Sequence, residues 1–121
     1  MKPVLVFATT NDGKLAELAA LVNDLFDLKS AADFSDFPEV EEDADTFVEN
    51  ALKKARAVAR FTGHNALADD SGLCVDALSG RPGVHSARYG RDDADRIARL
   101  LLELDGVPAE RRGAHFSCAL A

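Results

Sequence analysis

An α/β fold is the class that the sequence predicts, in a single domain spanning residues 1–121. Short apolar runs typical of buried strands alternate with longer segments in which apolar residues recur every three or four positions, as on one face of a helix. The chain is 47% hydrophobic and 29% charged, which is the composition of a globular domain with an enclosed core. We therefore expect helices packed against a sheet.

The first strand is expected over residues 3–9, a run rich in Val, Leu and Phe. Polar residues 10–13 end it. The helix that follows carries one apolar stripe composed of Leu15, Leu18, Ala19, Val22 and Leu25. Residues 26–33 are expected to hold a short second strand. The first unit is therefore a strand, a tight polar turn and a helix.

The second helix is expected to begin after Thr46, because Thr46 and Glu49 fit a capping box in which each side chain accepts a hydrogen bond from the other residue's backbone amide. It ends near Thr62 and Gly63, and its buried stripe consists of Val48, Ala51, Leu52, Ala55, Val58 and Ala59. Residues 66–68 then form a short strand that runs into a polar turn over 69–72. Residues 73–78 form another strand or a continuation, and a loop follows.

The third helix is expected from Asp93 to Leu104, where Asp105 and Gly106 provide a stop signal. Its inward face consists of Ile97, Leu100, Leu101 and Leu104. A last strand is expected over residues 115–121.

The net charge of −7 is concentrated in one segment, and it argues against binding to a nucleic-acid backbone, which needs a basic face. Residues 33–49 carry eight of the 21 acidic residues and no Lys or Arg, and the other 13 are balanced by 14 basic residues. Charge alone favours a solvated, self-repelling loop. The alternative is a cation site, because hard divalent ions prefer carboxylate oxygens.

The sequence predicts a cytoplasmic protein with no membrane partner. No apolar stretch approaches the roughly 20 residues needed to span a bilayer. The N-terminus lacks the long apolar region and cleavage site of a signal peptide. Cys74 and Cys118 have no metal-ligand spacing, and we expect them to be buried thiols rather than a disulfide.

The turn before the first helix is a candidate phosphate site. It lies at a helix N-terminus, where free backbone amides and the helix dipole favour anions. Lys14 adds a full positive charge from the first helical turn. The segment lacks the glycine spacing of a P-loop, and an ordinary turn capped by Asn11 or Asp12 is the alternative interpretation.

Two further groups of polar residues could carry chemistry. Asp69, Asp70 and Ser71 follow a strand, and ligands of open α/β sheets collect at the carboxyl ends of strands. Successive strand residues face opposite sides, so at most one of the two aspartates is expected to face the site fully. Lys53 and Lys54 lie about 100° apart on a helix, so only one can reach a given cleft. A polar turn and a solvated helix face are the alternatives.

Taken together, these segments resemble the inosine/xanthosine triphosphate pyrophosphatases, which remove deaminated purine nucleotides. The match begins with Thr9, Asn11 and Lys14, like a Thr-x-Asn-x-x-Lys phosphate loop, and continues through Glu42 and the runs 46–51 and 54–55. It is most specific from the run 68–73, Ala-Asp-Asp-Ser-Gly-Leu, to the run 82–89, Pro-Gly-Val-His-Ser-Ala-Arg-Tyr. Order and spacing hold across nearly all of the chain.

The resemblance implies a mixed sheet flanked by helices around an active-site cleft. It implies hydrolysis of dITP, ITP or XTP to the monophosphate and pyrophosphate, with Mg²⁺ as cofactor and a homodimer as the assembly. The implied metal ligands are Glu42, Asp70 and Asp69, and Asp70 is also the implied general base on the attacking water. The implied substrate-binding residues are Thr9, Thr10, Asn11, Asp12, Gly13, Lys14, Lys54 and Ser71.

Two departures from the family pattern matter. Gly90 follows Tyr89 directly, where the family usually has one more small residue. The family also continues with a C-terminal part that grips the base, so we expect this domain to be incomplete at its C-terminus. The alternatives are a nucleotide- or metal-binding module without turnover, a related Maf-like nucleotide pyrophosphatase, and an interaction protein that uses its acidic segment against a basic partner.

Overall fold

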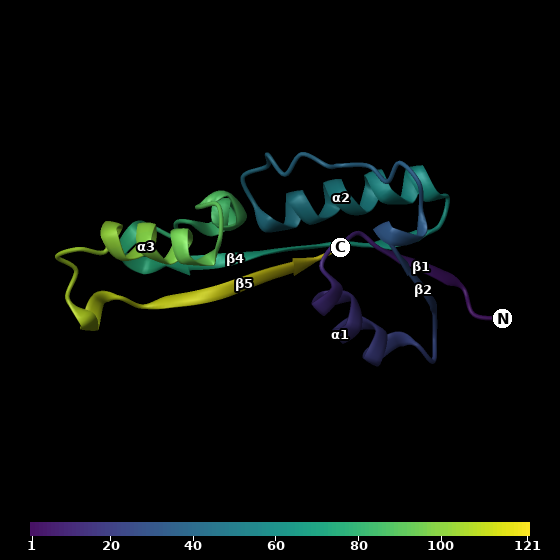
Figure 1. The fold of residues 1–121 in the computed structure, drawn as a ribbon, viewed down its shortest axis with the longest axis horizontal. Helices are drawn as coiled ribbons and strands as arrows, with labels where there is room; N and C mark the ends of the chain where they lie inside the picture. The colour runs from purple at the N-terminus through teal and green to yellow at the C-terminus, as the bar shows by residue number, and fades with distance from the viewer.

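The computed structural model describes residues 1–121 and contains two sheets (Figure 1). A parallel sheet has the strand order β2-β1-β3, and a separate antiparallel sheet pairs β4 with β5. The strands are β1 (Val4–Phe7), β2 (Asp27–Ser30), β3 (Asn65–Leu67), β4 (Asp69–Val75) and β5 (Ala114–Leu120). The α/β class is confirmed, with the parallel and the antiparallel pairs in different sheets.

The helices lie on both sides of the parallel sheet and along the antiparallel pair. In Figure 1, α1 and α2 stand on opposite sides of β1 and β2, and α3 lies beside the far part of the long β4–β5 pair. The three helices are α1 (Asp12–Val22), α2 (Phe47–Thr62) and α3 (Asp93–Glu103), and the short 3₁₀ helices are η1 (Ala31–Asp33), η2 (Asp76–Leu78), η3 (Gly83–Arg88) and η4 (Ala109–Arg111). None of the helices combines the length and the apolar character needed to cross a membrane.

Two small apolar cores hold the elements together. The first lies between the parallel sheet and α2 and contains Val6, Ala8, Val58 and Ala68. The second lies where α3 meets the far end of β4 and contains Val75, Leu78 and Leu104. Because β4 runs from one core to the other, its first residues lie at the edge of the parallel sheet.

The chain passes from the parallel sheet to the antiparallel one at Ala68. This residue is fully buried and exchanges two backbone hydrogen bonds with Ala121, at 2.8 and 2.9 Å. Asp69 and Asp70 are therefore the first residues of β4, in register with β5. The polar turn expected over 69–72 is wrong, because β5 supplies a ladder partner for this segment. The strand expected over 73–78 ends at 75 and continues as η2.

The helix ends follow the expected capping only in part. Asn11 caps α1, because its Oδ1 accepts a hydrogen bond from the Lys14 amide at 3.0 Å. Thr46 caps α2 by accepting one from the Glu49 amide at 3.1 Å. The exposed Glu49 carboxylate makes no bond in return, so the capping box is half formed. Gly63 follows α2 with a φ of 71°, a left-handed conformation that glycine adopts readily.

The apolar stripes are less buried than the sequence predicts. Leu25 lies beyond the end of α1 and is exposed, as is Val48 in the first turn of α2. On α3, Leu104 is buried, whereas Ile97 and Leu101 are more than half exposed. No segment of this chain packs over these side chains, so an amphipathic pattern that correctly predicts a helix fails to predict its burial.

Both cysteines are free thiols, and the expectation that both are buried is wrong. Cys74 is half-buried, and Cys118 is exposed. β5 lies at the edge of a two-stranded sheet and most of its side chains are exposed, which places Cys118 at the surface.

A close approach of η3 to β4 depends on a glycine. A Cβ atom at Gly72 would lie 2.2 Å from the Gly83 carbonyl oxygen and 2.6 Å from the Ser86 hydroxyl. That hydroxyl donates to the Gly83 carbonyl oxygen at 2.7 Å and accepts from the Leu73 amide at 2.9 Å. These contacts lock the two segments together and hold η3, with Arg88 at its end, beside the start of β4.

Replacement of Gly72 by Ala should lower the free energy of unfolding by about 2–3 kcal/mol, because the added methyl group meets backbone atoms that no side-chain rotation can move. Gly63→Ala is the matched control. Nothing lies within 4 Å of a Cβ there, and the left-handed backbone alone opposes it, at a net cost of about 1 kcal/mol. Urea denaturation measures both. A loss at Gly72 no larger than at Gly63 would contradict the close approach.

Candidate active site

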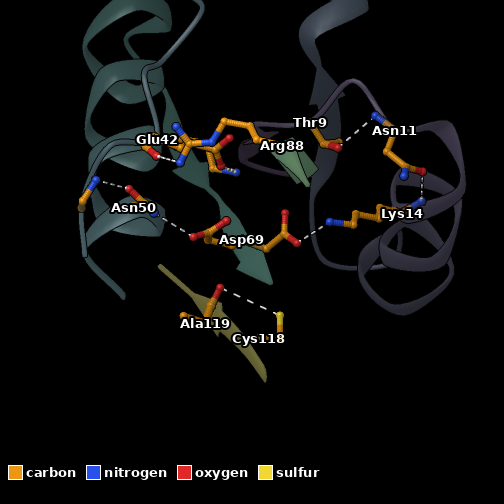
Figure 2. A network of polar contacts seen from close by, with 12 residues as sticks. Thr9, Asn11, Lys14, Glu42, Asn50, Asp69, Arg88, Cys118 and Ala119 are labelled. Atoms are coloured by element: carbon orange, nitrogen blue, oxygen red, sulfur yellow. Dashed lines mark hydrogen bonds and ion pairs between the residues drawn. The ribbon is translucent and has the colours of Figure 1, made fainter. Parts of the chain in front are cut away.

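A cleft of about 540 Å³ lies where the β1–α1 turn, the acidic segment, α2 and the start of β4 meet. In Figure 2, side chains of the turn stand on one side, those of the acidic segment and α2 on the other, and Asp69 lies between them. The polar residues that line the cleft are Thr9, Thr10, Asn11, Lys14, Glu39, Glu41, Glu42, Lys54, Asp69, Asp70, Ser71 and Arg88.

The wall formed by the β1–α1 turn has the geometry of an anion site. Thr9 Oγ1 accepts a hydrogen bond from the Asn11 amide at 3.0 Å, and Asn11 Oδ1 accepts one from the Lys14 amide. The amides of Asp12 and Gly13, in the first turn of α1, have no acceptor within the chain. Free amides and the positive end of the helix dipole make this N-terminus favourable for an anion.

Two of the expected turn residues lie outside the lining of the cleft. Because Asn11 is the cap, Asp12 and Gly13 belong to the first turn of α1, where both are exposed. The structure thus brings the side chains of Thr9, Thr10 and Asn11 to the cleft, whereas the next two residues lie outside its lining.

Lys14 reaches from the first turn of α1 to Asp69, with 2.7 Å between Nζ and Oδ2 (Figure 2). The Asp69 side chain is only 9% exposed, whereas that of Lys14 is 42% exposed. A carboxylate this buried is costly without a partner, so the ammonium group compensates it. The contact joins the turn to Asp69, and the lining of the cleft includes Asp70 as well.

A second lysine–carboxylate pair joins α2 to the acidic segment. Lys54 Nζ lies 2.8 Å from Glu42 Oε1, and both residues line the cleft. Lys53 pairs with Asp43 instead and lies outside the lining. Only one of the two adjacent lysines reaches the cleft, as their separation around the helix predicts.

Asp70 and Asp69 diverge, as neighbours on a strand should. Asp70 Oδ2 accepts a hydrogen bond from Asn50 Nδ2 at 3.0 Å and makes no ion pair. Partial burial raises the pKa of Asp70 above its ordinary value of 3.8; the bond from Asn50 opposes this shift, and the charge of Glu42 adds to it. Both aspartates line the cleft, but Lys14 occupies Asp69, so Asp70 is the more available carboxylate.

Two residues to which the sequence analysis assigns no role belong to this site. Asn50 is completely buried on α2, and Lys54 and Val58 follow it at intervals of four on the same face. Arg88, at the end of η3, donates to the Glu42 carbonyl oxygen at 3.0 Å. The spacing of Asn50 is a signal that the sequence contains. Nothing local to Arg88 indicates its approach to the acidic segment.

The lining is acidic on balance. It contains three cationic side chains (Lys14, Lys54 and Arg88) and five carboxylates (Glu39, Glu41, Glu42, Asp69 and Asp70). A strongly anionic ligand would therefore need a cation with it. No group of three or more His, Cys, Asp or Glu side chains is gathered to hold a metal ion, so the three expected ligands do not form one cluster.

A helix N-terminus that faces carboxylates across a cleft is an arrangement by which α/β proteins bind a phosphorylated ligand together with a divalent cation. Among proteins with such a site, comparison with known families identifies one family. The sequence pattern of the Ham1 family matches residues 5–121, and the chain belongs to that family.

Curated relatives match nearly the whole chain. A protein of Geobacter sulfurreducens named dITP/XTP pyrophosphatase is 59% identical over 121 residues, which cover 97% of this chain and 61% of the relative. A protein of the same name from Geobacillus kaustophilus is 55% identical, over 97% of this chain and 59% of the relative. This chain therefore spans about 60% of the length of the curated relatives it matches.

Solved structures agree with the fold. A HAM1 protein from Coxiella burnetii superposes with a TM-score of 0.89 at 43% identity, covering 100% of this chain and 62% of the other. A nucleoside-triphosphatase, dITP/XTP pyrophosphatase, from Mycobacterium abscessus gives a TM-score of 0.83 at 44% identity, covering 98% and 65%. The two-sheet arrangement around the cleft is thus shared with proteins of this family.

In the metal-free protein, the raised pKa of Asp70 predicts a gain in stability when its charge is removed. A folded-state pKa above the unfolded value contributes stability at low pH that is lost as the pH rises through the raised pKa. Asp70→Asn keeps an acceptor for Asn50. Given the solvent exposure of the group, it should raise the free energy of unfolding at neutral pH by on the order of 0.5 kcal/mol. The difference should vanish below pH 3.8.

Urea denaturation in the presence of a chelator measures this gain. Asp43→Asn is the control, because the Lys53 side chain holds the pKa of Asp43 below its ordinary value, so removing that charge should give no gain. Equal gains in the two variants, or a loss at Asp70, would contradict the electrostatic environment described for Asp70.

Proposed function

We propose that this chain is the phosphate- and metal-binding part of a pyrophosphatase that hydrolyses non-canonical purine nucleoside triphosphates such as dITP, ITP and XTP. The observation that carries the proposal is that the β1–α1 turn and the carboxylates of β4 and the acidic segment line one cleft. The names of the relatives support the substrate class. The products would be a nucleoside monophosphate and pyrophosphate, so the reaction would remove deaminated purines from the nucleotide pool.

The proposed substrate site uses the anion-binding wall of the cleft. Free amides at the N-terminus of α1 and the ammonium groups of two lysines would contact the triphosphate. The exposed hydroxyl of Ser71, at the start of β4, would contact the substrate from the floor of the cleft. The groups assigned to the triphosphate are the side chains of Thr9, Thr10, Asn11, Lys14 and Lys54 and the backbone amides of Asp12 and Gly13.

The donor set fits a Mg²⁺ ion held by Glu42 and Asp70. Both carboxylates line the cleft. Mg²⁺ usually keeps several waters and binds one or two carboxylates together with substrate phosphates. Both Glu42 and Asp69 are paired with a lysine, but Asp69 suits this role less, because its carboxylate is only 9% exposed, whereas that of Glu42 is 37% exposed. The ion would supply positive charge against the phosphates.

The proposed chemistry is in-line hydrolysis between the α- and β-phosphates. A water oxygen attacks the α-phosphorus, and the bond to the bridging oxygen breaks with its electron pair leaving on pyrophosphate. Asp70 has one oxygen held by Asn50; its other oxygen has two lone pairs, one that would face the ion and one that takes the proton of the water. Lys14 and Lys54 stabilise the charge that develops on the departing group.

A homodimer in the cytoplasm, without nucleic-acid or membrane partners, belongs to the same proposal. The family resemblance supports the dimer, and the net charge of −7 supports the absence of a nucleic-acid partner. Light scattering on the purified chain measures its oligomeric state.

Incubated with Mg²⁺, the chain should release pyrophosphate from ITP and XTP, with ATP as the comparison substrate. Asp70→Asn should lower kcat about 10²- to 10⁴-fold, as expected for loss of a general base. Asp105→Asn, on the exposed turn after α3, is the matched control and should retain activity. Release of orthophosphate would indicate a different hydrolase. Binding without turnover would identify a binding module, and a preference for other modified nucleotides would favour a Maf-like activity.

Two variants should separate the roles of the lysine and the carboxylate. Lys14→Ala should raise the KM for the triphosphate about tenfold or more, since a hydrogen bond to a charged group contributes about 1.5–3 kcal/mol. Glu42→Gln should instead raise the Mg²⁺ concentration needed for half-maximal rate. Lys53→Ala is the control, because Lys53 pairs outside the cleft. Kinetics unchanged in both site variants would contradict these assignments.

A further inference from the structure

Asn50 connects the two carboxylate-bearing segments of the cleft (Figure 2). Its Nδ2 donates to Asp70 Oδ2 at 3.0 Å, and its Oδ1 accepts a hydrogen bond from the Ala44 amide at 2.9 Å. Ala44 lies two residues after Glu42 in the acidic segment. A single side chain therefore contacts both the aspartate on β4 and the loop that carries the glutamate.

The complete burial of Asn50 requires an explanation. Its exposed fraction is 0%, and a primary amide is expensive to bury unless its donor and acceptor are both satisfied. Leu would fill a similar volume in the same helix face without that requirement. The two hydrogen bonds, rather than packing, are therefore what an amide provides at this position.

We infer that Asn50 is a positioning residue, which sets the orientation of Asp70 and the position of the Glu42 loop so that both carboxylates can serve one divalent cation. The identity of the reaction rests on the proposed function. A free aspartate rotates broadly about χ2, and the acidic segment repels itself. With one oxygen of Asp70 occupied by Asn50, the other oxygen is the one presented to the cleft.

The other contacts of the loop do not duplicate this role. Lys54 pairs with the Glu42 carboxylate, and Arg88 donates to the Glu42 carbonyl oxygen. Lys53 pairs at the surface with Asp43, the residue after Glu42. The Lys53 pair is exposed to solvent, where ion pairs hold a loop weakly, and none of these three side chains makes a hydrogen bond to β4. Lys54 is also one of the groups assigned to the substrate.

Two variants separate the hydrogen bonds of Asn50. Asn50→Leu removes both bonds at similar volume. Asn50→Asp keeps an oxygen that can accept from Ala44 and loses the donor to Asp70. Val75→Ala is the control for a general loss of stability, because Val75 is buried in the second core and lies outside the lining of the cleft.

Hydrogen exchange at the Ala44 amide is the first readout, and it needs no substrate. Protection should fall in Asn50→Leu and should be retained in Asn50→Asp and in Val75→Ala. The affinity for Mn²⁺, a paramagnetic substitute for Mg²⁺ at oxygen ligands, is the second readout, measured by electron paramagnetic resonance without nucleotide. It should fall about tenfold or more in Asn50→Leu, as when other outer-shell partners of metal ligands are lost, and stay within about twofold in Val75→Ala.

Steady-state kinetics with ITP is the third readout. Both Asn50 variants should lose kcat about tenfold or more, with KM changed less than about threefold, after the rate is divided by the folded fraction of each variant, because partial unfolding by itself lowers the apparent kcat at unchanged KM. Unchanged Mn²⁺ affinity and kcat in Asn50→Leu would overturn the inference and leave Asn50 a structural residue. A wild-type chain that releases no pyrophosphate would count against the proposed function, whereas the exchange and Mn²⁺ results would still decide the role of Asn50.

Discussion

The buried junction at Ala68 is the constraint on which the site depends. Its two hydrogen bonds with Ala121 hold the chain where it leaves the parallel sheet, so the backbone fixes where Asp69 and Asp70 begin β4. The turn that follows β1 meets them because β1 and β3 are neighbours, and the Ala8 amide donates to the carbonyl oxygen at the end of β3 at 2.8 Å. Strand order and one sheet-to-sheet crossing thus bring a helix N-terminus and two carboxylates together.

The charges gathered at this junction are compatible with a folded chain because each has a local partner. Lys14 compensates Asp69, and Lys54 compensates Glu42. Asp70 receives a neutral hydrogen bond from Asn50 instead of an ion pair, which holds it in place while leaving its pKa raised. The two carboxylates on β4 are therefore in different electrostatic states although they are adjacent in sequence.

The parts of this site that the sequence predicts are those with local signals. The Asn11 cap and the start of α2 at Thr46 follow from capping chemistry within a few residues. The strand character of residues 69–72 does not, because it arises from pairing with β5 about 50 residues later. The Lys14–Asp69 contact, which spans 55 residues, has no local signature either. The spacing of apolar residues predicts the helix α3 but not how deeply it is buried, because burial depends on what packs against a helix.

Lys14 and Lys54 in this cleft are each paired with a carboxylate in the absence of a ligand, which bears on the selectivity for anions. Under the proposed function, a simple anion such as inorganic phosphate would add its negative charge beside carboxylates that already share the two ammonium groups. A polyphosphate that carries its own cation would bring negative charge for the ammonium groups and positive charge for the carboxylates. On that proposal, the internal carboxylates would compete with small anions, and a ligand already chelated to a cation would be favoured over a bare anion.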